Sequence, residues 1–557
     1  MYRLFKTHDI RKAYEADALW DFETEDGGYK GKLAVPSCWE TVPALASYKG
    51  KAVYTKNIYF GGNLRFVFKG VSHTADVYCD GKLIAHHYNA YTPFNADVFT
   101  AYGEHTIKIV VDNSYSQDSV LHKENDYYTY GRIIRPLIIE ELNKAVINYI
   151  NFEPFMENEK WKARIKLNIE SKSDTEEAFE LHMRLNNRSF SSDNISIPAN
   201  SQAVFEYVFD FEDVRDYSPE NPLLYTLKAE LYQGENAIDD LIEKVGFREI
   251  KTEGKKLLLN GKPIKLKGFN RHESYNSLGC SIPLQAMMRD IALIKETGAN
   301  SIRTSHYPND ELFLDLCDET GLLVWEEAHA RALNADNMSN PNFIPQSFDC
   351  IDEMIINHYN HPSIFCWGIL NECVSDTDFG RECYSKLYNR ICENDTSRPK
   401  TSASNRNSTD ICFDLEEIVS VNLYSRWYNF HPDNVSDGIN YIKNHMKETG
   451  NDNKPFIISE IGAGAIYGYR SDTNCKWSEE RQAQILDEQL SAVLADDDIC
   501  GVFVWQFCDC RVDESWFVNR PKTENNKGVV DEFRRKKLSY ATVKKHFISK
   551  PLYICEL

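Results

Sequence analysis

An apolar strand that ends in an amide and a carboxyl is predicted for Trp367-Gly368-Ile369-Leu370-Asn371-Glu372. A second strand of the same kind is predicted for Phe456-Ile457-Ile458-Ser459-Glu460. Continuous apolar runs of this length are typical of strands that are buried on both faces, as in a parallel sheet covered by helices. A carboxylate at the mouth of such a strand is costly to desolvate, so Glu372 and Glu460 must each be paired, hydrogen-bonded or functional.

Strands of this kind alternate with amphipathic helices through the C-terminal half of the chain. Helices are predicted over residues 283–297 and 479–494, where apolar side chains recur every three to four positions. The alternation predicts a (β/α)₈ TIM barrel over residues 251–557. The candidate strands lie at residues 264–269, 301–304, 322–327, 364–371, 401–404, 418–424, 456–461 and 502–507.

The preceding residues predict two β-sandwiches. Residues 1–143 contain short β segments separated by turn signals such as Gly61-Gly62 and Asp80-Gly81, and we expect a jelly-roll sandwich there. Residues 144–250 continue with alternating strands such as residues 162–169, which fits one immunoglobulin-like sandwich. The chain is therefore expected to be multidomain, with two β domains before an α/β barrel.

Composition excludes several classes of function. The 557 residues include 63 basic and 84 acidic side chains, and the net charge of −21 repels nucleic acid and anionic membranes. No run approaches the about 20 apolar residues of a membrane helix, and the start lacks a secretory signal, so we expect a cytoplasmic protein. The 15 cysteines are scattered without zinc-site spacing, and we expect reduced thiols, no metal and no cofactor.

Barrel enzymes place their active sites at the C-terminal ends of the strands. Glu372 and Glu460 end the predicted fourth and seventh strands, so they would face each other across the barrel mouth. Retaining glycoside hydrolysis needs two carboxyl groups about 5–5.5 Å apart, one protonating the leaving oxygen and the other attacking the anomeric carbon. The alternative from strand position alone is that both are salt-bridged rim acids.

Several short motifs are spread along the whole chain. They are residues 35–39 (Val-Pro-Ser-Cys-Trp), 70–73 (Gly-Val-Ser-His), 91–94 (Tyr-Thr-Pro-Phe), 246–248 (Gly-Phe-Arg), 268–273 (Gly-Phe-Asn-Arg-His-Glu), 300–308 (Asn-Ser-Ile-Arg-Thr-Ser-His-Tyr-Pro) and 367–372. In order and spacing they resemble the motifs of the retaining β-glycosidases of glycoside hydrolase family 2. The resemblance implies a sugar-binding jelly roll, an immunoglobulin-like sandwich and a catalytic barrel, with Glu372 as the acid/base and Glu460 as the nucleophile.

The choice of sugar depends on residues after the eighth strand. The string Asn525-Asn526-Lys527 is similar to the Asn-x-Lys motif of the family's β-glucuronidases, in which an amide and an ammonium receive the C6 carboxylate. A lysine charge with an amide donor suits a carboxylate better than an uncharged hydroxyl. We therefore expect hydrolysis of terminal β-D-glucuronides, either small molecules or uronic-acid-terminated glycans. The alternative is that Lys527 is an ordinary loop residue.

The same resemblance implies further substrate-binding residues. Asp97 resembles the jelly-roll aspartate that reaches into the sugar pocket, and Tyr424 would hold the nucleophile. Arg511 and Arg520 are two candidates for the arginine that usually precedes the Asn-x-Lys motif, because Pro521 stands at its usual place. The remaining candidates are His306, Asn371, Asn422, Tyr428 and Trp505.

Three alternatives remain open at this stage. The first is another enzyme of the family, a β-galacturonidase or a β-galactosidase. Arg331, near the third strand, could contact a carboxylate or an axial hydroxyl, which would admit galacturonides, or it could simply pair with a local acid. A metal-dependent hydrolase would use His272, Glu273, His306 and His329. A non-catalytic carbohydrate-binding protein is the third. The resemblance also implies a homo-oligomer, a dimer or a tetramer.

Overall fold

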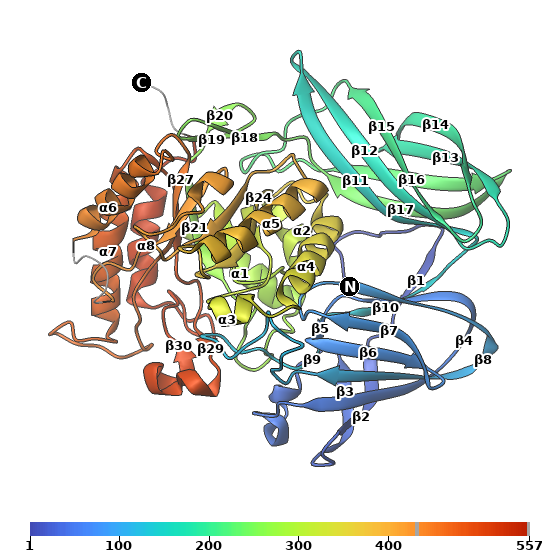
Figure 1. Ribbon diagram of the computed structural model, residues 1–557, viewed down its shortest axis with the longest axis horizontal. Coiled ribbons are helices and arrows are strands. Elements are labelled where there is room, and N and C mark those ends of the chain that lie inside the picture. The colour runs from blue at the N-terminus through green and yellow to red at the C-terminus, as the bar shows by residue number, and fades with distance from the viewer. Residues whose placement is uncertain (429–433, 554–557) are drawn as a thin grey trace.

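The computed structural model describes residues 1–428 and 434–553. Figure 1 shows an N-terminal sandwich in blue, a second sandwich in teal and green, and an α/β barrel in yellow to red. The barrel lies against both sandwiches, and its helices form its outer layer. In the described part of the chain, no helix is long and apolar enough to cross a membrane.

The first sandwich is built on an antiparallel sheet in the order β1-β10-β4-β8-β6-β7, with β2 pairing to β3 and β4. The predicted turn at Gly61-Gly62 is wrong: β4 continues through it, and a bulge with Gly62 at φ +91° bends the strand. The strands are β1 (Lys12–Glu15), β2 (Ala18–Thr24), β3 (Lys30–Val35), β4 (Lys51–Phe68), β5 (Val71–Ser72), β6 (Thr74–Cys79), β7 (Lys82–Tyr88), β8 (Phe94–Asp112), β9 (Arg132–Ile133) and β10 (Leu137–Glu141).

The second sandwich packs a three-stranded sheet, β11-β12-β15, against a four-stranded sheet, β14-β13-β16-β17. Apolar side chains alternate along both sheets and meet in one core, as expected for an immunoglobulin-like domain. The strands are β11 (Ala145–Glu157), β12 (Lys160–Ser171), β13 (Glu177–Leu185), β14 (Arg188–Ile197), β15 (Gln202–Phe211), β16 (Tyr225–Gln233) and β17 (Asn236–Val245). A small sheet, β18 (Ile250–Glu253), β19 (Lys256–Leu259) and β20 (Lys262–Pro263), leads to the barrel.

The barrel has eight parallel strands in the order β25-β24-β23-β22-β21-β28-β27-β26. A parallel bridge between Ser404 and Val421 joins the two ends of this order and closes the barrel. The first and last strands are displaced by two and three residues from the predicted ranges. The strands are β21 (Leu266–Arg271), β22 (Ser301–Thr304), β23 (Leu323–Glu327), β24 (Ile364–Asn371), β25 (Lys400–Ala403), β26 (Val419–Asn422), β27 (Phe456–Ile461) and β28 (Ile499–Val504).

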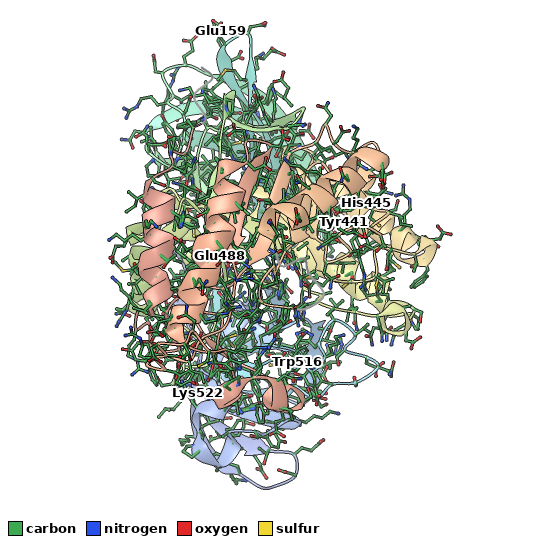
Figure 2. The ribbon with its side chains drawn as sticks, turned by 90° about the vertical axis from the view of Figure 1, so that its left-hand side faces the viewer. Glu159, Tyr441, His445, Glu488, Trp516 and Lys522 are labelled. Atoms are coloured by element: carbon green, nitrogen blue, oxygen red, sulfur yellow. The ribbon has the colours of Figure 1, made fainter. Side chains whose placement is uncertain are left out.

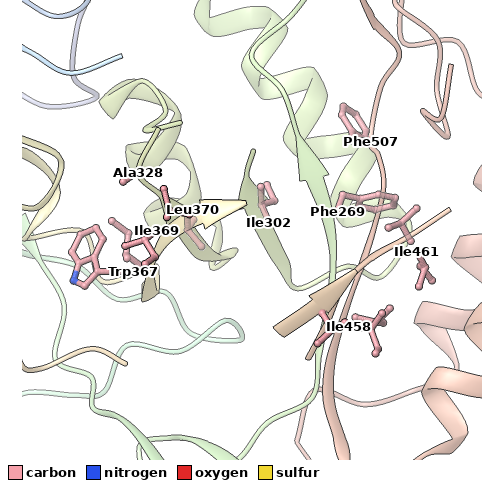
Figure 3. Packing of buried hydrophobic residues seen from close by; sticks show 14 of the residues in the cluster. Phe269, Ile302, Ala328, Trp367, Ile369, Leu370, Ile458, Ile461 and Phe507 are labelled. Carbon is pink, nitrogen blue, oxygen red and sulfur yellow. The ribbon is translucent and has the colours of Figure 1, made fainter. Parts of the chain in front are cut away.

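Helices cover the outside of the barrel and bury their apolar faces against it. Helix α1 buries Met287, Ile291 and Ile294, and α2 is capped by the Asp310 side chain and ends at Gly321 with φ +71°. Figure 3 shows Phe269, Ile302 and other strand side chains in the shared core. The helices are α1 (Leu284–Glu296), α2 (Glu311–Thr320), α3 (Ala335–Met338), α4 (Phe343–His358), α5 (Asp378–Asn394), α6 (Val435–Glu448), α7 (Glu479–Ala495) and α8 (Leu538–Ile548).

The mouth of the barrel is completed by two irregular segments. Residues 113–131 of the first sandwich are largely buried and reach the barrel, where the Tyr127 hydroxyl lies 3.1 Å from Nε2 of His329. After β28, a hairpin formed by β29 (Cys510–Arg511) and β30 (Glu524–Asn525) carries two short turns, Glu514–Asn519 and Pro521–Thr523. Figure 1 shows this hairpin and its red turns at the end of the barrel that faces the first sandwich.

Candidate active site

Glu460, at the end of β27, is buried and held on both carboxylate oxygens. Nη1 of Arg303 donates to Oε1 at 2.9 Å, and the Tyr424 hydroxyl donates to Oε2 at 2.5 Å. Burial raises the pKa of Glu460 and the charge of Glu372 adds to this rise, while Arg303 and Tyr424 oppose it. The carboxylate is therefore fixed in orientation inside the barrel.

Arg303, on β22, connects four polar side chains at the bottom of the site. Its Nε donates to Glu327 at 2.7 Å, and its two terminal nitrogens donate to Asn270 at 2.8 Å and to Asn371 at 2.9 Å, besides Glu460. Because Arg303 and its four partners come from five different strands of the barrel, the barrel itself sets their geometry.

Glu327 is a second buried carboxyl beside the candidate nucleophile. Its Oε1 lies 2.9 Å from Nδ1 of His306. Burial raises the pKa of Glu327 to about 8, Arg303 opposes the rise, and the charges of Glu460 and Glu372 add to it. Burial also lowers the pKa of His306 well below its ordinary value, so this imidazole is neutral.

Glu372, one residue past β24, lies in a more open position than Glu460. The side chain of Glu372 is 16% exposed and that of Glu460 is 5% exposed. Nδ2 of Asn422 donates to Oε1 of Glu372 at 2.9 Å, and the guanidinium of Arg331 lies 3.6 Å from Oε2. The backbone of Glu372 has φ +53°, a region that residues other than glycine adopt mainly in turns and at functional sites.

A cationic cluster lies beside the two glutamates. It contains Lys527 and Arg520, both buried, and the Lys527 ammonium lies 5.4 Å from the centre of the Tyr428 ring. Burial opposes ionisation of Tyr428, but the charges of Lys527 and Arg520 outweigh it and lower the pKa of this phenol. Asn525 donates to the backbone carbonyl of Asp126 at 3.3 Å. Two cations, an amide and a phenol therefore lie close together at this side of the site.

The first sandwich supplies two polar residues that the sequence analysis missed. The Asp126 carboxylate accepts from Nε of Arg520 at 2.6 Å, and Oδ1 of Asn125 accepts from Arg331 at 2.7 Å. Both lie in the irregular segment 113–131, outside any strand of the sandwich. A long segment without strand periodicity between two β-rich regions is the signal that could have drawn attention to them.

The structure brings most of the predicted site residues together and places two elsewhere. Trp505 stacks on His306 with the ring centres 5.0 Å apart. Asp97, by contrast, pairs with Arg65 and with Lys172 of the second sandwich, at 2.7 Å each, so it lies at the junction of the two sandwiches. The Arg511 guanidinium donates to the Ala46 carbonyl and covers a tyrosine ring of the first sandwich.

The residues of the metal-dependent alternative are engaged with protein groups. Glu273 accepts from Arg135 at 2.8 Å, and Nδ1 of His272 lies 3.2 Å from the Tyr307 hydroxyl. Within residues 1–428 and 434–553, two groups of side chains have ligand atoms close enough together to hold a metal ion. They are Cys79-Asp80-His105 on the first sandwich and Asp315-Asp318-His361, from α2 and the loop before β24. Neither group includes a residue of the candidate active site.

Family models account for nearly the whole chain. Residues 29–142 match the sugar-binding domain of glycosyl hydrolases family 2, residues 145–248 match the domain named for the family itself, and residues 250–549 match its TIM barrel domain. The chain belongs to glycosyl hydrolase family 2. It is accordingly a β-glycosidase, with the expected multidomain fold of a sugar-binding domain, an immunoglobulin-like sandwich and a barrel.

Members of the family that are similar to this chain include several enzymes of uronic acids. A β-galacturonidase from Eisenbergiella tayi, solved with galacturonate bound, is 48% identical over the whole of both chains, with a TM-score of 0.97. A β-glucuronidase from Dictyoglomus thermophilum is 26% identical, covers 99% of each chain and has a TM-score of 0.85. A Bacteroides fragilis β-glucuronidase is 27% identical over 91% of this chain and 77% of its own.

Proposed function

We propose that this family 2 enzyme is a retaining β-uronidase with Glu460 as nucleophile and Glu372 as acid/base. In the first step the Glu460 carboxylate attacks the anomeric carbon while Glu372 protonates the leaving oxygen, which gives a glycosyl ester and the free aglycone. In the second step Glu372 takes a proton from water, and the water attacks the anomeric carbon and releases the sugar with its original configuration.

The hydrogen bonds of both glutamates support these roles. Arg303 and Tyr424 hold both oxygens of Glu460, which leaves little freedom for the attacking group. Asn422 holds one oxygen of Glu372, and the Ser459 hydroxyl donates to Asn422 at 2.7 Å, which orients its amide. The more exposed position of Glu372 suits a group that gives a proton to the leaving oxygen and takes one from water in each cycle.

A uronic acid is supported by the cationic cluster. Lys527, Arg520 and Asn525 offer charged and neutral donors to a C6 carboxylate, and a neutral C6 hydroxyl would leave two buried cations with one carboxylate, Asp126. This cluster is the single observation that carries the assignment to uronides.

Galacturonides and glucuronides both remain candidate substrates, and we place galacturonides first. The sequence motif alone favoured glucuronides, but identity over the full length is 48% to a β-galacturonidase and 26% to a β-glucuronidase. Arg331 lies 3.6 Å from Glu372. A cation at this position, near the sugar hydroxyls, also supports a galacturonide as substrate. Arg331 pairs with a local acid and faces the site at the same time. Cytoplasmic location and a dimer or tetramer remain predictions.

A panel of 4-nitrophenyl glycosides tests the proposal. We expect kcat/KM to be highest for the β-galacturonide, lower for the β-glucuronide and lowest for the β-galactoside. Preference for glucuronide over galacturonide would restore the assignment made from the motif, and preference for the galactoside would contradict a uronidase.

Lys527→Ala tests the carboxylate contact in the same assay. A hydrogen bond to a charged group is worth about 1.5–3 kcal/mol, so kcat/KM on uronides should fall about 10- to 150-fold, with little change on the galactoside. Lys522→Ala is the matched control, because Lys522 precedes the motif but pairs with Glu532 at 3.0 Å. Full uronide activity in Lys527→Ala would show that Lys527 is only a loop residue.

A further inference from the structure

The loop after β29 carries an aromatic ring next to the candidate active site. Trp516 lies in the short turn Glu514–Asn519 and is partly exposed. Figure 2 shows it on the face turned to the viewer, close to the first sandwich. Trp516 is not among the site residues predicted from the sequence.

Both ends of this loop are fixed to the first sandwich. The Asp513 carboxylate accepts from the backbone nitrogen of Asn125 at 3.0 Å and from the Tyr115 hydroxyl at 2.9 Å. At the other end, Arg520 pairs with Asp126. The two ends of the loop are therefore bound to the adjacent residues Asn125 and Asp126. Because the loop that carries Trp516 is fixed at both ends, little conformational entropy would be lost when a ligand contacts the ring.

Two arginines of the site lie near the Trp516 ring. The Arg331 guanidinium lies 5.9 Å from the centre of the Trp516 ring, and the Arg520 guanidinium lies 5.4 Å from it. Arg331 also lies 3.6 Å from Glu372, whereas Arg520 belongs to the cationic cluster. Trp516 therefore stands next to the side of the site where the proposed acid meets the leaving oxygen.

From this placement we propose that Trp516 is the aglycone platform of the enzyme, binding a flat ring that is attached to the scissile oxygen. The proposal rests on the proposed role of Glu372. A general acid contacts the glycosidic oxygen, so the aglycone begins beside Glu372, and Arg331 lies close to both Glu372 and Trp516. A partly exposed indole offers an apolar face to an aromatic ring or to the apolar face of a second sugar.

The test compares two substrates that differ only in the aglycone. A 4-nitrophenyl glycoside can contact the platform, whereas the glycosyl fluoride of the same sugar has a single atom as leaving group and cannot. Trp516→Ala should lower the ratio of kcat/KM for nitrophenyl over fluoride by about tenfold, the size of one good aromatic contact. Trp516→Phe should restore most of the ratio. A disaccharide measured against the same fluoride shows whether sugar rings also use the platform.

Val518→Ala is the matched control, because Val518 lies two residues further on the same turn and is 94% exposed. Its ratio should equal that of the wild type. An unchanged ratio in Trp516→Ala, whether both activities fall together or neither falls, would overturn the proposal, since a purely structural role would affect both substrates alike. The ratio is measured on the sugar that the wild type hydrolyses best, so failure of the uronide assignment does not affect this test.

Discussion

Glu460 and Glu372, the two proposed catalytic glutamates, have different surroundings. Glu460 is enclosed within the barrel, and its partners Arg303 and Tyr424 come from the barrel alone. Glu372 is three times as exposed, and its partner Arg331 continues to Asn125 of the first sandwich. Glu460 is thus held by barrel side chains alone, whereas Glu372 is held by Asn422 of the barrel and by Arg331, which also contacts the first sandwich.

This difference matches what each step of the proposed reaction demands. A nucleophile must be ionised and correctly oriented before it attacks, which a closed barrel can provide at fixed geometry. An acid/base must change protonation state and meet different aglycones, which a site on the edge of the barrel allows. Substitutions of Glu460, Glu372 and Tyr424 should separate these two demands.

Glu460→Gln should abolish turnover while leaving the fold intact. The amide cannot form the glycosyl ester, and we expect kcat to fall by about 10⁴-fold or more. A 2-fluoro glycosyl inhibitor should label Glu460 in the wild type, with peptide mass spectrometry as the measurement. Labelling of Glu372 or Glu327 instead would contradict the assignment of Glu460 as the nucleophile.

Glu372→Ala should have an effect that depends on the leaving group. General acid catalysis contributes about 10²- to 10⁴-fold, so glycosides with poorly acidic phenols should lose that much in kcat/KM, and those with acidic phenols much less. Azide should rescue turnover and give the β-glycosyl azide, because the more open position of Glu372 leaves room for a small anion once the carboxylate is removed. Equal losses across leaving groups, without rescue, would argue against an acid role.

Tyr424→Phe tests the hold on the nucleophile with a smaller change. The Tyr424 hydroxyl donates to Glu460 at 2.5 Å, and a hydrogen bond to a charged group is worth about 1.5–3 kcal/mol. We expect kcat/KM to fall about 10- to 150-fold on good and poor leaving groups alike. Loss confined to poor leaving groups would place Tyr424 on the acid side instead.

The barrel was predictable because its signals are local. A strand buried on both faces must be apolar throughout, so β24 and β27 are visible in single sequence windows, and the acids that end them stand out. Family resemblance added the roles of Glu372 and Glu460, which strand position alone left open between catalysis and rim salt bridges.

Residues contributed across domain junctions were not predictable in this way. Asn125 and Asp126 reach the site through a segment with no regular period, and nothing local shows which barrel residue they meet. Asp97 was assigned to the sugar pocket by resemblance, but its neighbours Arg65 and Lys172 place it at the junction of the two sandwiches. Such contacts depend on how the domains pack against one another, and the hydrophobic pattern of the sequence does not predict this.

A modest effect on stability is expected from Glu327, the buried carboxyl that contacts Arg303 and His306. Burial raises its pKa to about 8 from an ordinary value of 4.5, so the folded state holds a proton that the unfolded state has lost between these two values. Stability that comes from a raised carboxyl pKa is complete below the unfolded value and disappears as the pH rises through the folded value. The free energy of unfolding should therefore fall from about pH 4.5 to about pH 8 because of this group.

Glu327→Gln removes this titration while keeping a neutral side chain of the same shape. We expect the thermal midpoint of the wild type, measured relative to that of Glu327→Gln, to fall by a few degrees across this pH window. Thermal unfolding of both proteins in buffers that span the window is the measurement. If the difference instead grew with pH, Glu327 would be ionised in the folded enzyme and paired with Arg303. The Arg303 guanidinium would then pair with two carboxylates, Glu327 and Glu460, instead of with Glu460 alone.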